Sequence, residues 1–240
     1  AASIASFDFV YLAGLQERNV VAPSVRSGDS SVFSAQAGGH VLEPSVGMHE
    51  NVWIFDYKSL YPSVMRTFNI DPLSFVQEQL DGKDISNESP SKNPEVLGVI
   101  EVLDGVQFSR EPAILPEILS YLFEKRQRAK HNRDDVASQA IKILMNSFYG
   151  VLGTPACRFH NPKIANAITS LGRHFLLWSK LWFEEAGYDV IYGDTDSVFV
   201  RSRMSDPLEA ESLGISIARD VNKKLNEYIR EKWGVQSCLE

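Results

Sequence analysis

Apolar residues recur at every third or fourth position in several stretches of the chain, which is the spacing of amphipathic helices. Asn161–Pro162 and Asp206–Pro207 each place a capping side chain before a proline, which is typical of a helix start. The pattern predicts helices at residues 4–16, 114–131 and 136–151, from Pro162 to the residues before Gly187, and from Pro207 onward. Residues 18–46 and 81–94 lack this period, so they are predicted to be a surface connection and a loop.

Two apolar patterns predict strands. The run Val52–Phe55 predicts a buried strand that places Asp56 at its end. Apolar residues on both sides of residues 192–197 predict a β-hairpin with a tight turn. Because alternate residues of a strand face one side of a sheet, Asp194 and Asp196 are expected to point the same way. Together the elements predict an α+β fold, with helices on one face of a sheet and acids on the other.

Composition narrows the class of protein. The chain has 240 residues, 44% of them hydrophobic, and a net charge of -7 with a pI near 5.3. This balance argues weakly against a free-standing nucleic-acid binder, whose contacts would need local basic patches. Cys157 and Cys238 have no metal-ligand spacing, and no signal peptide or membrane span is predicted. A cytoplasmic protein without a disulfide is expected, and its abrupt ends predict an excised fragment.

The carboxylates of the turn predict a metal site. Like charges this close repel, so Asp194 and Asp196 make sense mainly if a cation such as Mg²⁺ lies between them. Asp-Thr-Asp-Ser is also an ordinary turn sequence, and on this stretch alone the turn is the better interpretation. Asp56 supplies a third acid, which favours the metal site because phosphate-handling cations are usually held by two or more acids.

Polar groups that could hold phosphate lie in three places. Pro62 is expected at the first position of a helix, so the backbone N–H groups of Ser59, Leu60 and Tyr61 would lie at its N-terminus and suit phosphate oxygens. The next two helices carry basic faces. Arg126 and Lys130 share one face of helix 114–131, and Lys142, Asn146 and Tyr149 share one face of helix 136–151. Solvated helix ends are the alternative interpretation.

Three motifs resemble one family, in that family's order. Asp56-Tyr-Lys-Ser-Leu-Tyr-Pro-Ser63, Lys142-Ile-Leu-Met-Asn-Ser-Phe-Tyr-Gly150 and Tyr192-Gly-Asp-Thr-Asp-Ser197 are similar to the polymerase motifs of family B DNA polymerases. The residues around them resemble the bacterial members. The resemblance implies an α+β palm, with an antiparallel sheet backed by helices in a ferredoxin-like layer and an inserted two-helix fingers hairpin. It implies these parts: 1–46 as an approach segment, 47–110 as palm, 111–155 as fingers, and 156–240 as palm that stops before a thumb.

The resemblance also implies an activity and roles. The activity is template-directed transfer of a deoxynucleotide from a dNTP to a primer 3′-hydroxyl, in DNA replication or repair. Two Mg²⁺ ions, which Mn²⁺ can replace, would be held by Asp56, Asp194, Asp196 and the carbonyl of Tyr57. The dNTP would contact these residues: Ser59, Leu60, Tyr61, Arg126, Lys130, Lys142, Asn146 and Tyr149. Tyr61 would exclude a 2′-hydroxyl. The implied partners are primer–template DNA and a sliding clamp that binds outside these residues, and no membrane.

Two other functions remain open from the residues. Three acids could serve a two-metal nuclease or phosphatase, because such sites also activate water. In a non-catalytic nucleic-acid-binding module, the acids would only cap or repel. The first leaves Tyr61 and the Lys142 helix face unexplained, and the negative charge disfavours the second.

Overall fold

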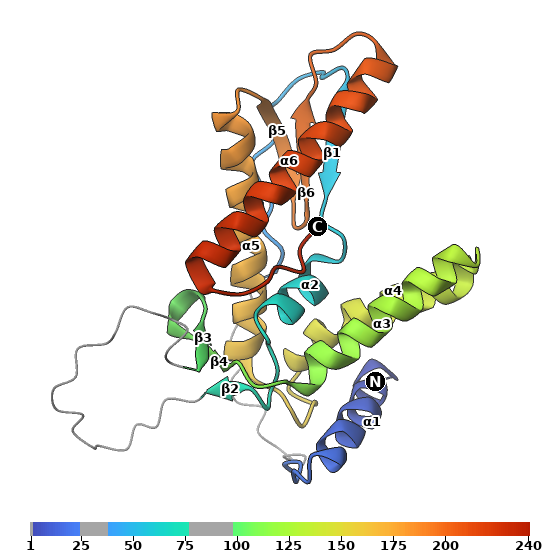
Figure 1. Cartoon of the computed structure of the whole chain (residues 1–240), viewed down its shortest axis with the longest axis vertical. Coiled ribbons are helices and arrows are strands. Elements are labelled where there is room, and N and C mark those ends of the chain that lie inside the picture. Colours follow the sequence, from blue (N-terminus) through green and yellow to red (C-terminus); the bar gives the residue numbers. More distant parts are fainter. Residues whose placement is uncertain (1, 25–37, 77–97) are drawn as a thin grey trace, which may run out of the picture.

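The computed structural model describes residues 2–24, 38–76 and 98–240. Figure 1 shows helices arranged around a larger and a smaller antiparallel sheet. The elements run in the order α1 (Ala2–Glu17), β1 (Val52–Asp56), α2 (Leu60–Thr67), β2 (Phe75–Val76), β3 (Val99–Glu101), the 3₁₀ turn η2 (Leu103–Gly105), β4 (Gln107–Ser109), α3 (Ile114–His131), α4 (Asp135–Leu152), α5 (Pro162–Glu185), β5 (Asp189–Asp194), β6 (Ser197–Arg201) and α6 (Pro207–Trp233).

The predicted helices are confirmed. The Asn161 side chain accepts from the N–H groups of Lys163 and Ile164 at the start of α5, and Asp206 caps α6 in the same way. One boundary is wrong, because α2 begins at Leu60 and Pro62 is its third residue. The reason is that Ser59 adopts a left-handed conformation and turns the chain into the helix two residues earlier.

The larger sheet has the strand order β1-β6-β5, and all its pairs are antiparallel. Its inner face, with Val198 and Val200, packs against Leu176 of α5 and Ile217 of α6, and Figure 1 shows both helices running along the sheet. The prediction of a buried β1 is wrong on one side. Ile54 is 61% exposed, because β1 is an edge strand whose outer face no helix covers. The α+β class with an antiparallel sheet is therefore confirmed.

The smaller sheet was not predicted from the sequence. It has the order β2-β4-β3, and Phe75 lies opposite Phe108 across its strands. Its strands are too short, at two or three residues each, to show an alternating pattern. The predicted loop at residues 81–94 lies outside the described residues. Within the described residues, no helix is both long enough and apolar enough to cross a bilayer.

Helix α1 shares the main core with α4. Phe7 and Tyr11 are almost fully buried, and their rings lie against Phe148 and Phe159. An ion pair of 3.1 Å between Asp8 and Arg158 holds the same helix from its polar side. Residues 2–17 are therefore integral to the folded core. The predicted boundaries at residues 46, 110 and 155 remain predictions.

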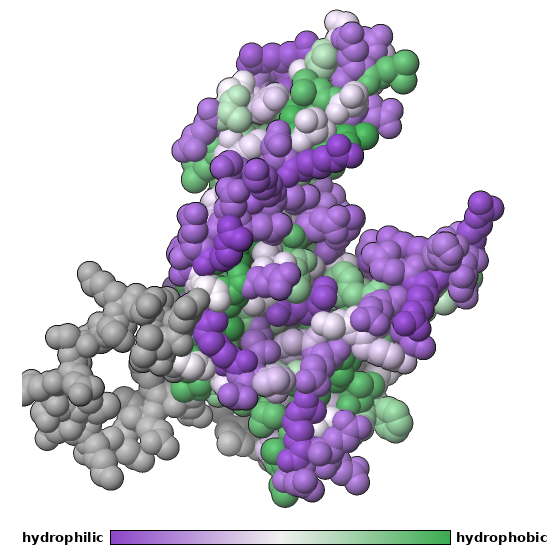
Figure 2. All heavy atoms as spheres, in the orientation of Figure 1, coloured by the Kyte–Doolittle hydropathy of each residue, from purple (hydrophilic) through white to green (hydrophobic). Residues whose placement is uncertain are grey.

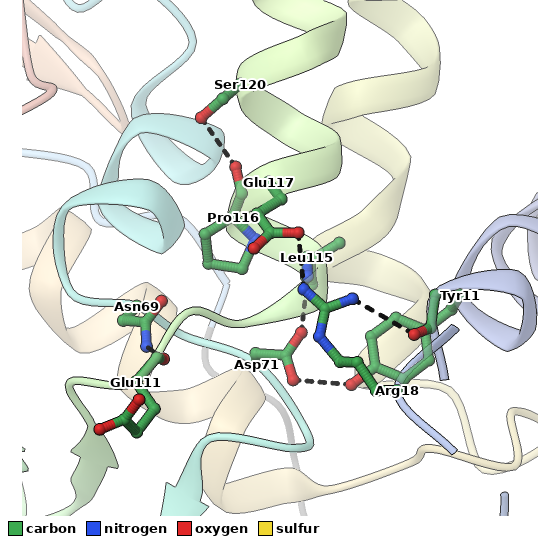
Figure 3. Close-up of polar contacts among 10 residues, drawn as sticks. Tyr11, Arg18, Asn69, Asp71, Glu111, Leu115, Pro116, Glu117 and Ser120 are labelled. Atoms are coloured by element: carbon green, nitrogen blue, oxygen red, sulfur yellow. Dashed lines mark hydrogen bonds and ion pairs between the residues drawn. The ribbon is translucent and has the colours of Figure 1, made fainter. Parts of the chain in front are cut away.

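A buried carboxylate joins α1 to the base of α3. Figure 3 shows Asp71 between Tyr11 and the first turn of α3. Its oxygens accept from the Tyr11 hydroxyl at 2.7 Å, the Leu73 N–H at 2.5 Å and the Leu115 N–H at 2.6 Å. Burial raises the pKa of Asp71, although these donors oppose the shift. Nearby, the Asn69 side chain donates to the carbonyls of residues 109 and 111, just before α3. These contacts fix where the α3–α4 hairpin begins.

We expect Asp71→Ala to lower the free energy of unfolding by about 3 kcal/mol, because the Tyr11 hydroxyl and the Leu115 N–H lose a buried acceptor and the Leu73 N–H loses one of its two acceptors. Tyr11→Phe should cost about 1 kcal/mol, since it removes one donor to Asp71 and one acceptor of the Leu73 N–H, while the two backbone N–H bonds to Asp71 remain. Urea unfolding followed by circular dichroism measures both. Asp220→Ala is the control, because Asp220 is exposed on α6 and should stay within about 0.5 kcal/mol of the unsubstituted chain. Equal stability of the Asp71→Ala and Asp220→Ala variants would contradict the role of Asp71.

Candidate active site

The pairing of β1 with β6 brings distant acids to one edge of the sheet. Asp56 lies opposite Ser197 on one side, and Asp194 lies opposite Ser197 on the other. The Ser197 hydroxyl donates to the Asp56 carboxylate at 2.6 Å. In Figure 1 the turn between β5 and β6 points toward α2 and the α3–α4 hairpin. Figure 2 shows that the surface is hollowed between the large sheet and the α3–α4 hairpin. The end of the sheet that carries the acids therefore borders an open hollow.

The turn itself differs from the prediction. Asp194 ends β5 and Asp196 lies in the turn, so the two side chains do not share the pleat of one strand. Thr195 between them has a φ of 51°, a left-handed conformation that an extended strand does not allow. The Asp196 carbonyl accepts from the Tyr57 N–H at 2.9 Å, which ties the turn to the residue after β1. Asp196 is thereby drawn toward Asp56.

The charges of this edge act mainly on Asp196. Asp56 and Asp194 are exposed, whereas Asp196 is half-buried. Burial raises the pKa of Asp196, and the neighbouring carboxylates of Asp56 and then Asp194 raise it further, while Lys142 lowers it. The structure therefore places Asp56, Asp196 and Lys142 within one electrostatic neighbourhood.

The acids fit a hard divalent cation in part. Two carboxylates that disfavour each other's charge at one spot suit an ion with oxygen ligands, because its charge removes the repulsion. Among the described residues, however, no three acid, histidine or cysteine side chains are arranged so that they could hold a metal together. The assignment of all three acids as metal ligands stays a prediction. Asp194 lies at the end of β5, where its carboxylate accepts from the Thr195 hydroxyl at 2.9 Å.

A candidate anion-binding position, called the anion seat below, lies at the start of α2, next to the acids. Ser59 precedes the helix, and the N–H groups of Leu60 and Tyr61 belong to its first turn, which has no intrahelical acceptors. Leu60 is buried, so only its backbone could reach a ligand. The Arg126 guanidinium of α3 reaches the Ser59 hydroxyl at 3.4 Å. Its Nε is shielded from solvent and has no hydrogen-bond partner among the described residues. A buried donor without an acceptor favours an anionic ligand here.

Tyr61 and Tyr149 form an aromatic pair above α5. Their ring centroids are 4.7 Å apart. A Cβ on Gly172 of α5 would come within 2.8 Å of the Tyr61 ring, so the absence of a side chain there lets the ring approach the helix backbone closely. Burial raises the pKa of Tyr61 to about 12, and Tyr149, Asp196 and Asp194 add to the shift. The phenol is therefore neutral and sits beside the acids.

The remaining predicted site residues are Lys130, Asn146 and Tyr57. The side chains of Lys130 and Asn146 are exposed, and within the described residues neither side chain forms a hydrogen bond or an ion pair. The Tyr57 side chain is turned away from the acids, because its hydroxyl bonds Ser179 at 2.6 Å. Sequence reasoning missed Ser197 and Gly172. The serine lies inside a motif already singled out, but its partner follows only from the strand register.

Comparison with known proteins identifies a family model that the chain matches and relatives to which it is similar. Residues 6–230 match the model of the family described as DNA polymerase family B. DNA polymerase II of Escherichia coli (strain K12) is 38% identical over 240 residues, which cover 99% of this chain and 28% of the relative. A DNA polymerase of Archaeoglobus fulgidus is 37% identical over 176 residues, or 68% of this chain and 20% of the relative. The chain thus spans less than a third of the length of either relative.

A solved structure agrees in fold. The family B DNA polymerase from Pyrobaculum calidifontis aligns with all of this chain and 29% of its own, with a TM-score of 0.61 and 24% sequence identity. At this identity the likeness concerns the fold alone.

We expect Asp56→Asn to lower the pKa of Asp196 toward its ordinary value, because a neutral neighbour no longer opposes ionisation. Burial persists in the variant, so the pKa should remain raised. Asp194→Asn should lower it less, since Asp194 contributes less than Asp56. NMR titration of labelled aspartate carboxyls in metal-free buffer measures these shifts. An unchanged Asp196 pKa in the Asp56→Asn variant would show that the two acids are not neighbours.

Proposed function

The chain belongs to DNA polymerase family B, and we propose that it carries a site for template-directed DNA synthesis. The reaction is attack of a primer 3′-hydroxyl on the α-phosphate of a dNTP, with release of pyrophosphate. One observation carries the proposal. Asp56 and Asp196 are 140 positions apart in the sequence, yet the β1–β6 register brings them to one edge beside an anion seat. Synthesis needs this combination of acids and phosphate-binding groups.

Mg²⁺ or Mn²⁺ ions, two in number, would be held by Asp56 and Asp196, with the Tyr57 carbonyl as a further ligand. When bound, they would lower the pKa of the 3′-hydroxyl and offset charge on the transferring phosphoryl group. Ser197 keeps the Asp56 carboxylate oriented through its 2.6 Å hydrogen bond. Asp194, whose carboxylate is bonded by Thr195, would adjust the local potential and become a ligand only after a side-chain rotation.

The triphosphate would lie at the start of α2. The N–H groups of Ser59, Leu60 and Tyr61 would donate to phosphate oxygens, since the first turn of a helix offers free donors. Arg126 supports this assignment, because its guanidinium already reaches Ser59 and its Nε lacks an acceptor in the part of the chain that the structure describes. Lys142, close enough to affect Asp196, would neutralise the phosphates on the side of the acids. Lys130 would join them from the exposed face of α3.

The sugar and base would lie over the aromatic pair. Tyr61 packs on Gly172 and against Tyr149, so its ring cannot sink further toward α5. A ring held there would meet a 2′-hydroxyl and so favour deoxynucleotides. Asn146 and Tyr149 would border the nascent base pair. Template sequence would be read by base pairing, with primer–template DNA in the hollow that Figure 2 shows.

In the proposed function, the elements of the fold would form the palm and the fingers of a polymerase. The large sheet with α5 and α6 would be the palm, and the α3–α4 hairpin the fingers. Any sliding clamp would bind outside these residues. A hydrolytic two-metal enzyme is less favoured, because hydrolysis gives no role to the Tyr61–Tyr149 pair or to the cations of α3 and α4.

We expect Asp196→Asn to lower the rate of Mg²⁺-dependent primer extension by about 1,000-fold, the effect of losing roughly 4 kcal/mol of transition-state stabilisation. The assay uses the natural protein that carries these residues, a primed template and a nuclease control. Asp220→Asn is the matched control, an exposed aspartate on α6. Extension at the rate of the control would remove Asp196 from the reaction, and loss of primer in place of extension would favour the hydrolytic alternative.

We expect Tyr61→Ala to increase incorporation of ribonucleotides relative to deoxynucleotides, because removal of the ring opens space for the 2′-hydroxyl. The measurement is the ratio of kcat/KM for a dNTP and the matching rNTP, which should fall at least tenfold, or about 1.4 kcal/mol. Tyr121→Ala serves as control, since Tyr121 is an exposed tyrosine of α3. An unchanged ratio in the Tyr61→Ala variant would exclude the tyrosine as the basis of sugar selection.

A further inference from the structure

A segment that the sequence presented as a plain connection lies along the free edge of β5. We call residues 39–45 the strap. The His40 carbonyl accepts from the Thr195 N–H at 2.8 Å, the Leu42 N–H donates to the Gly193 carbonyl at 2.8 Å, and the Ser45 N–H donates to the Ile191 carbonyl at 2.8 Å. Val41 forms an antiparallel bridge with Asp194. The strap therefore runs antiparallel to β5, and its first residues lie at the acidic turn.

The strap is anchored in the core of the large sheet. Leu42 is 8% exposed and belongs to the apolar cluster that includes Leu176, Phe183 and Val198. Further along, the Ser45 carbonyl bonds the His49 ring at 2.9 Å, and that ring in turn bonds Arg201 of β6 at 2.6 Å. Because the strap is held both at Leu42 and at Ser45, its position can determine the position of the acidic turn.

The turn needs such support. Thr195 is β-branched and has a φ of 51°, a strained conformation that persists only where the surroundings enforce it. The His40 carbonyl binds the N–H of this residue. Within the turn, the Asp196 N–H donates to the Asp194 carbonyl at 2.5 Å, so the conformation of Thr195 sets the direction of both acids.

Gly39 is where the strap meets Thr195 most closely. A Cβ on Gly39 would overlap the Thr195 hydroxyl and lie 3.0 Å from its Cβ and its Cγ2. A Cβ on Gly38, one residue earlier, would meet no atom of the described residues within 4 Å. Neither glycine has a positive φ, so alanine fits the backbone at both positions. The two glycines thus differ in whether a methyl group strikes the acidic turn.

We propose that the strap is a positioning element for the polymerase site, in which Gly39 and the His40 carbonyl hold Thr195 in its left-handed conformation and thereby fix Asp196 relative to Asp56. Gly39 and His40 act through the turn and not on the substrate. This proposal rests on the proposed function, because it assigns a role toward the same reaction. It also makes a structural claim about the turn that is measurable without catalysis.

The structural claim is tested first, on the 240-residue chain without metal or nucleotide. We expect Gly39→Ala to speed hydrogen exchange of the Thr195 N–H at least tenfold, because the methyl group separates it from the His40 carbonyl. Gly38→Ala should leave this exchange unchanged. Equal exchange in the two variants would overturn the proposal, whatever the activity of the protein.

The catalytic claim is tested by primer extension with the natural protein that carries these residues. We expect Gly39→Ala to lower kcat by about 10–100-fold with little change in the KM for dNTP, because displaced acids affect the reaction more than nucleotide binding. Gly38→Ala should match the unsubstituted protein. A Gly39→Ala effect confined to KM would overturn the positioning role, since it would indicate a substrate contact.

A double-mutant cycle separates contact with Thr195 from general damage. Thr195→Gly removes the hydroxyl and the methyl that the new Cβ would strike, and glycine tolerates the left-handed conformation. In the Thr195→Gly background, Gly39→Ala should have no further effect on kcat. An undiminished effect there would overturn the proposal. If the unsubstituted protein showed no extension, the proposed function would fail, while the exchange experiment would still decide whether the strap holds the turn.

Discussion

The pairing of β1 with β6 is the constraint on which the site depends. Its register places Asp56 opposite Ser197, and a shift by one residue would turn Asp56 toward the helices and Phe55 toward solvent. That shift is opposed by the core, because Phe55 packs on Phe183 with a centroid separation of 4.7 Å. Hydrophobic burial on the inner face therefore fixes the chemistry on the outer face. The Tyr57 N–H bond to the Asp196 carbonyl extends the same register by one residue beyond the strand.

The site works against the stability of the fold that carries it. Burial and two neighbouring carboxylates disfavour ionised Asp196, the Arg126 Nε has no acceptor among the described residues, and Thr195 holds a strained conformation. None of these features improves packing. The first two would be relieved by a ligand that brings cations to the acids and phosphate oxygens to the arginine. Unfavourable interactions gathered in one place are expected at a site whose residues serve binding and not folding.

The sequence predicted the elements better than their contacts. The helices follow from apolar spacing and from the caps Asn161 and Asp206, which are local signals. Asp56, Asp196 and Lys142 could be singled out as candidates because their motifs are local too. The strap could not, because residues 39–45 carry no periodic pattern and their pairing with β5 is a long-range contact. The exposed side of β1 was missed for the same reason, since an apolar run does not reveal that a strand lies at an edge. Gly172 and Ser197 gain meaning only once Tyr61 and Asp56 are placed in space.

In the proposed site, the hydrogen bonds of Asp71 at the base of α3 would determine how Arg126 and Lys142 can move relative to Asp56 and Asp196. The first turn of α3 is held by Asp71 and the approach to it by Asn69, both in the turn that follows α2. Arg126 lies 11 residues beyond Leu115, or about 16 Å along the helix at 1.5 Å per residue, so a rotation of about 10° at the base would move it by about 3 Å. That displacement is the length of a hydrogen bond. Because α2 and the turn are packed in the main core, such a rotation would carry Arg126 and Lys142 across the anion seat while leaving Asp56 and Asp196 in place. In the proposed function, a fixed base and an exposed outer end would let the α3–α4 hairpin close on a ligand without disturbing the register that holds the acids together.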